Sequence, residues 1–113
     1  MELKFFPQAI ATAERDLLNR DQDLDVAIQA LAFIESEIER AIAEDPELKN
    51  DQQRKAKRLE MQGDRSYTEA RDSVKRAKHK KGLAEIKVNK TRNEFIVKKL
   101  EFRREIANLE AIA

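Results

Sequence analysis

The chain of 113 residues contains no cysteine and no tryptophan, and only two glycines and two prolines. Without cysteine it can form no disulfide framework, thiolate nucleophile or cysteine-ligated metal site. Gly63 and Gly82 stand apart, so no glycine-rich loop is present to hold a nucleotide phosphate. No segment approaches the roughly 20 apolar residues of a membrane-spanning helix. These absences predict a cytoplasmic protein with no cofactor and no membrane partner.

The composition instead favours long helices. Charged residues make up 40% of the chain and hydrophobic residues 41%, a balance typical of coiled coils. Disordered chains can be as highly charged, but they lack a sustained apolar period, which this sequence has. The length suits one domain. We therefore expect a single all-α domain.

The first predicted helix covers residues 7–44. Pro7 suits a first helical turn, and Asp45 and Pro46 end the pattern. Within this segment one apolar series repeats every seven residues and a second, less complete one runs beside it. The members of the first are Ile10, Leu17, Leu24, Leu31 and Ile38, and those of the second are Ala13, Ala27, Ile34 and Ala41.

A short connector helix is predicted over residues 50–62, capped by Asn50 or Asp51 and ended by Gly63. Ser66 and Glu69 have the spacing of a capping box, which predicts the start of a second long helix over residues 66–111. Its main series also repeats every seven residues and contains one polar member. The series is Tyr67, Val74, Lys81, Val88, Phe95, Phe102 and Leu109.

These elements predict a long antiparallel, coiled-coil-like helical hairpin with a short connector helix. Antiparallel pairing is expected to bring Leu17 near Phe95 and Ile38 near Val74, with the aromatic residues of the second long helix in the core. A two-helix hairpin buries only one stripe per helix. Three apolar residues off the main stripe therefore form a candidate oligomer interface. They are Ile96, Val97 and Leu100.

The charges are divided unequally along the chain. Residues 8–47 hold eleven acids and three bases, whereas residues 48–113 hold 19 bases and ten acids. The densest basic run is residues 71–81, and its Lys and Arg members are candidate phosphate-binding residues. They are Arg71, Lys75, Arg76, Lys78, Lys80 and Lys81. Two interpretations remain open: the run contacts nucleic acid, or it is neutralised by the acidic first helix.

No catalytic or metal-binding constellation is recognisable. His79 is the only histidine, so the paired Glu-x-x-His motifs of carboxylate-bridged metal bundles are lacking. Glu35, Glu37 and Glu39 occupy a long helix with no loop to form a pocket, which favours a solvated acidic face over acid–base chemistry. We expect no enzyme activity and no small-molecule substrate.

From residue 48 onward the chain resembles a family of small helical-hairpin proteins of phages and integrated elements. The resemblance lies in residues 48–56 (LKNDQQRKA), in Tyr67 opening a long helix, and in residues 91–95 (TRNEF). Such proteins are often encoded near recombination or single-strand-binding genes, so the resemblance implies that context. The basic run 71–81 departs from the more acidic third helix that is common in the family.

These observations predict a non-enzymatic structural or protein-interaction hairpin that self-associates, with a protein partner also compatible. The alternative is a nucleic-acid-binding accessory protein, in recombination, that uses the basic run 71–81.

Overall fold

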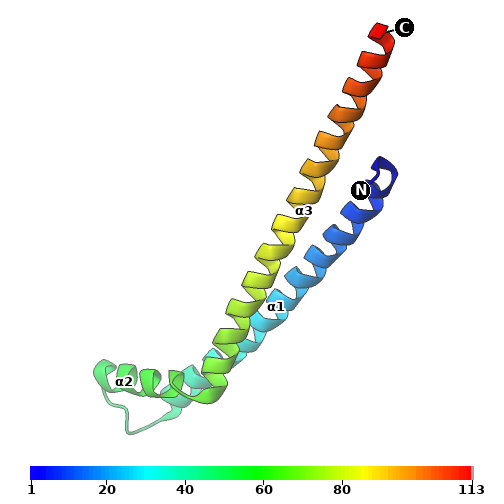
Figure 1. Cartoon of the computed structure of the whole chain (residues 1–113). Coiled ribbons are helices and arrows are strands. Elements are labelled where there is room, and N and C mark those ends of the chain that lie inside the picture. The colour runs from blue at the N-terminus through cyan, green and yellow to red at the C-terminus, as the bar shows by residue number, and fades with distance from the viewer. Residues whose placement is uncertain (113) are drawn as a thin grey trace. The chain divides into compact units, whose positions relative to one another are not determined.

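The computed structural model describes residues 1–112 and is entirely helical apart from short connections (Figure 1). A 3-10 turn, η1 (Leu3–Phe5), leads directly into α1 (Phe6–Glu44). The connector helix is α2 (Asp51–Gln62), and α3 (Arg65–Ile112) follows it. The chain is thus an all-α helical hairpin with a short connector helix, as the periodicity predicts. Each helix bound lies within one residue of its expected position.

The packing divides the chain into two compact units. The first unit combines Met1–Arg20 with Lys80–Ala113, and therefore contains the start of α1 and the greater part of α3. The second unit is Asp21–His79, which contains the rest of α1, all of α2 and the start of α3. Both long helices contribute to both units.

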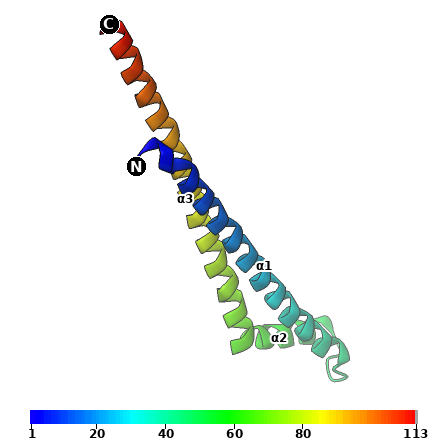
Figure 2. The ribbon, with the colours of Figure 1, turned by 90° about the vertical axis from the view of Figure 1, so that its right-hand side faces the viewer.

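In the first unit, α1 and α3 pack antiparallel around an aromatic contact. The rings of Phe6 and Phe95 stack with their centroids 5.3 Å apart, and the ammonium group of Lys99 lies 4.5 Å from the centroid of Phe95. Figures 1 and 2 both show the beginning of α1 beside α3 at a point well before α3 ends. The buried apolar residues of this unit are Phe6, Ala13, Ala84 and Val88.

This contact gives the pairing a register that differs from the expected one. The periodicity predicts that Phe95 lies near Leu17, but Phe95 packs on Phe6. Phe6 is eleven residues before Leu17, or about 16 Å along a helix. Arg92 donates a hydrogen bond to Glu14 at 2.6 Å, in the same antiparallel sense. Eleven residues are about three helical turns, so a hairpin shifted by that distance presents the same faces. Seven-residue periodicity alone could not distinguish the two registers.

The expectation that the aromatic series of α3 lies in the core is correct only in part. Tyr67 and Phe95 are half-buried, but Phe102 is 51% exposed and Leu109 is 67% exposed. The reason is the register: because α1 begins beside Phe95, the later turns of α3 have no α1 residue to pack against.

In the second unit, α2 is fastened to α1 by a bidentate ion pair. Arg58 donates from Nε and Nη2 to the two carboxylate oxygens of Glu39, at 2.6 and 3.1 Å. The hydrogen bond from Arg58 lowers the pKa of Glu39 from its ordinary value, aided by the guanidinium charge and opposed by partial desolvation. The same hydrogen bond and the carboxylate charge raise the pKa of Arg58. The buried apolar residues of this unit are Leu24, Ile38, Ile42 and Val74.

Local capping explains where α2 begins, whereas the expected cap of α3 differs. Asn50, one of the two candidate caps, accepts a hydrogen bond from the Gln53 amide at 2.8 Å, and the Gln53 side chain accepts from the Lys49 amide at 2.7 Å. In the capping box expected at the start of α3, Ser66 and Glu69 would each bind the other residue's backbone amide, but both side chains have other partners. The Ser66 hydroxyl donates to the carboxylate of Asp64 at 3.1 Å.

The carboxylate of Glu69, the other member of the expected box, instead pairs with Arg65 at 2.7 Å. The helix α3 begins at Arg65, one residue before the expected position, and the Thr68 amide donates a hydrogen bond to the carbonyl of Asp64 at 3.1 Å.

Replacing Phe6 by alanine is expected to lower the free energy of unfolding by about 3 kcal/mol, because an almost fully buried ring is lost from the register contact. Phe5 is the matched control: it is the adjacent residue of the same type, and it is 53% exposed. Phe5→Ala should change stability by no more than about 0.5 kcal/mol. Urea unfolding followed by circular dichroism measures both. Equal losses for the two variants would show that the stack does not secure α1.

Acidification should weaken the attachment of α2. Because the pKa of Glu39 is lowered in the folded chain, its stabilising contribution is present above its unfolded pKa and is lost as pH falls through the folded pKa. Glu39→Gln should therefore melt at a lower temperature than the parent at neutral pH, and the difference should vanish in acid. Glu37→Gln, which removes only a 3.6 Å contact with Arg40 on the same helix, is the control. A difference independent of pH would contradict this role of Glu39.

Candidate functional site

The basic run 71–81 lies on α3, and the boundary between the two compact units falls inside it, after His79. In the second unit, Arg71, Lys75 and Lys78 have the i, i+4, i+7 spacing that places side chains on one face of a helix. Arg76 directly follows Lys75, so its side chain is turned about 100° away from that of Lys75 around the helix. The run is therefore not a single surface of six cations, and its largest co-facial set within one unit is these three.

The contacts of this co-facial set leave it open to solvent. Arg71 has an ion pair with its own neighbour Asp72, at 3.7 Å, and both side chains are about half exposed. Lys75 and Lys78 are exposed and form no ion pair with any of residues 1–112. Two acidic residues of α1 pair with bases outside the run: Glu37 with Arg40 and Glu39 with Arg58. The ion pairs Glu39–Arg58 and Glu14–Arg92, which join different helices, both use arginines outside the run.

The other predicted members of the run are less uniform. Arg76 donates a hydrogen bond to the Ser73 hydroxyl at 3.0 Å. In the first unit, Lys80 is exposed and borders a shallow hollow of about 200 Å³ that also contains the Asp16–Arg20 ion pair. Lys81 is half-buried and takes part in a polar or ionic interaction, which agrees with its place in the apolar series.

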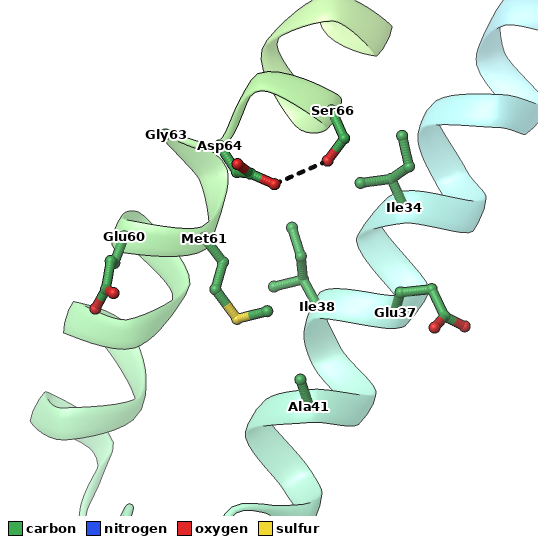
Figure 3. A pocket seen from close by; sticks show the side chains of 9 residues that line it. All are labelled: Ile34, Glu37, Ile38, Ala41, Glu60, Met61, Gly63, Asp64 and Ser66. Carbon is green, nitrogen blue, oxygen red and sulfur yellow. Dashed lines mark hydrogen bonds between the residues drawn. The ribbon is translucent and has the colours of Figure 1, made fainter.

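A larger hollow, of about 790 Å³, lies in the second unit between α1 and the turn that joins α2 to α3 (Figure 3). Its floor is apolar: Met61 reaches from α2 toward Ile38 of α1, and Ile34 lies one turn away. Figure 3 shows the carboxylates of Glu37 and Glu60 directed away from this floor. The hollow suits an apolar side chain better than a charged ligand. The sequence does not reveal this hollow, because periodicity does not determine how the connector helix packs on α1.

The predicted oligomer interface lies in the first unit. Ile96, Val97 and Leu100 are each at least 50% exposed, and their spacings of three and four residues place them on one broad side of α3. Val97 also lines a hollow of about 680 Å³ beside Met1 and Phe6. The structure therefore brings these three residues together on an open apolar surface.

A second apolar surface on the same helix was missed. Phe102, Ile106 and Leu109 are 51%, 40% and 67% exposed, and they follow the i, i+4, i+7 spacing of one face. Leu100 and Phe102 are two residues apart, which turns their side chains about 200° from each other. The two surfaces therefore lie on nearly opposite sides of α3. A signal was present in the sequence, since the predicted helix over residues 66–111 is longer than the predicted helix over residues 7–44 and its last turns therefore lack a partner.

Sites of other kinds find little support in the described part of the chain. Among residues 1–112, no group of three or more histidine or carboxylate side chains is arranged to hold a metal ion. None of the helices there combines the length and apolar character needed to cross a bilayer. The candidate sites on the described residues are two apolar faces of α3, the apolar hollow at α2, and the exposed bases of α3.

Comparisons with protein-family models, with curated proteins and with solved structures found no significant match, so the interpretation of these surfaces depends on the chain's own residues.

Proposed function

We propose that this protein is a non-enzymatic helical interaction module that self-associates through apolar surfaces left open by its hairpin. The observation that carries the proposal is the balance of buried and exposed apolar residues. Among residues 1–112, eight hydrophobic residues are buried and sixteen large hydrophobic side chains are exposed. Single exposed apolar residues are common on monomers, but continuous rows of them mark interaction sites.

The packing of the single chain supports the same proposal. None of the larger side chains in residues 1–112 is less than 2% exposed, so the hairpin by itself has a thin core. Isolated helices and two-helix pairs gain most of their stability from burying an apolar face against another element. Association of copies covers such faces without any change of fold. A protein partner can use the same surfaces, including the apolar hollow beside Met61.

The test is the mass of the full chain in solution. At about 50 µM, light scattering coupled to gel filtration should give a multiple of the 13.1 kDa chain, and the mass should fall on dilution. A 13.1 kDa particle at every concentration up to about 100 µM would eliminate self-association.

A second candidate function, contact with nucleic acid, is favoured by one observation: Arg71, Lys75 and Lys78 share a face, and the two lysines have no ion pair within residues 1–112. Three phosphate contacts would give a logarithmic salt dependence with a slope of about −2.7 on duplex DNA. Such contacts position a protein on the backbone but do not read sequence.

If the bases of this face bind phosphate, affinity for a labelled duplex should fall roughly 40-fold between 50 and 200 mM salt. Changing Arg71, Lys75 and Lys78 together to glutamine should remove most of that binding. The control removes the same charge elsewhere on α3, by changing Lys98, Arg103 and Arg104 to glutamine. Equal effects of the two triple variants would indicate non-specific attraction, and no binding of the parent at 50 mM salt would eliminate this function.

A further inference from the structure

We propose that two copies of this chain pair antiparallel through the last turns of α3, using the face formed by Phe102, Ile106 and Leu109. This segment, residues 96–112, is called the α3 extension below. The inference rests on the proposed self-association and identifies the surface and the partner: a second copy of the same segment. It differs from the surface predicted from sequence, which consists of Ile96, Val97 and Leu100.

Burial decreases along the apolar series of α3 toward its C-terminal end. Val88 is 3% exposed, Phe95 is half-buried against Phe6, Phe102 is 51% exposed and Leu109 is 67% exposed. These residues repeat every seven positions on one unbroken helix, so they occupy the same face. Burial declines where α1 begins, while the apolar pattern continues. The exposed face is thus the continuation of an interface that α1 covers within the chain.

The direction of α1 also favours an antiparallel second copy. α1 runs antiparallel to α3 in the first unit, as the Phe6–Phe95 and Glu14–Arg92 contacts require. A second α3 extension that pairs antiparallel with the first runs in the same direction as α1. It therefore continues the line of α1 along the face that α1 leaves uncovered. Figure 2 shows that α3 continues past the start of α1. Phe102 of one copy then lies opposite Ile106 of the other, and α1 of each copy begins where the other extension ends.

The distribution of charge along the α3 extension favours antiparallel pairing. Residues 98–104 hold four bases and one acid, whereas residues 105–112 hold two acids and no base. Antiparallel pairing about the middle of the extension places the basic half of each copy beside the acidic half of the other. Parallel pairing would place like charge beside like charge. The opposed helix dipoles also favour the antiparallel arrangement.

The size of the extension sets the expected strength. Seventeen residues span about 25 Å at about 1.5 Å per residue, so the contact belongs near the lower end of the range for specific interfaces. We therefore expect a reversible dimer with a dissociation constant in the micromolar range, detectable at tens of micromolar protein.

The experiment compares two variants with matched exposure and spacing. Phe102→Gln with Ile106→Gln removes the proposed face, and Ile96→Gln with Leu100→Gln removes the opposite face at the same i, i+4 spacing. All four side chains are 40–56% exposed, so neither pair should unfold the hairpin, which circular dichroism verifies. The first pair should weaken dimerisation at least about tenfold and the second by less than about twofold, measured by sedimentation equilibrium.

The orientation is tested by disulfide formation, since the chain has no cysteine of its own. Lys99 and Glu110 are eleven residues apart and so lie on the same side of α3. Antiparallel pairing brings Lys99 of one copy beside Glu110 of the other. A mixture of the K99C and E110C variants, oxidised at about 50 µM, should therefore form the mixed disulfide in preference to either homodimer. Predominant homodimers would overturn the antiparallel arrangement.

The outcomes separate this inference from the proposed function. A parent chain that remains monomeric contradicts both. A parent that associates but is disrupted only by the Ile96 and Leu100 changes, or by neither pair, overturns the α3 extension as the interface and leaves self-association standing.

Discussion

The stacking of Phe6 on Phe95 is the contact on which the rest of the first unit depends. It fixes where α1 begins along α3, and the Glu14–Arg92 ion pair holds the same antiparallel sense. With this register, Ala84 and Val88 are buried and Phe102 and Leu109 are not. The register set by this contact therefore determines which residues of the apolar series of α3 are buried and which are exposed. The exposed face of Phe102, Ile106 and Leu109 results from that register.

The acidic first part and the basic second part of the chain contact each other through individual ion pairs instead of through their whole charged faces. Ion pairs between the acidic first part and the basic second part include Glu14–Arg92 and Glu39–Arg58. Both are partly exposed, so their main contribution is orientation and register rather than large stabilisation. The dense basic run takes no part in these two pairs. Arg58 and Arg92 thus carry part of the attraction between the acidic and basic parts of the chain, while Lys75 and Lys78 remain exposed on α3.

The sequence was sufficient to predict the helices, because two apolar series with helical spacing were bounded by recognisable stop signals. It also predicted buried positions such as Leu24 and Val74. It was insufficient for the register, since a shift of whole helical turns keeps the same faces in contact and only specific side-chain contacts, such as Phe6 with Phe95, distinguish one register from another. Phe6 could have been found, as it lies four residues before Ile10 on the same stripe. The hollow at Met61 could not, because it depends on how α2 folds against α1.

The central claim is that the face of Phe102, Ile106 and Leu109 is open in a single chain and covered when two chains meet. Amide hydrogen exchange of residues 102–109, measured at several protein concentrations, tests it directly. A helix end without a packing partner exchanges quickly, and a covered one exchanges slowly. The account predicts protection that rises with concentration in this segment while the amides around Val88 stay protected throughout. Exchange in residues 102–109 that is independent of concentration would contradict it.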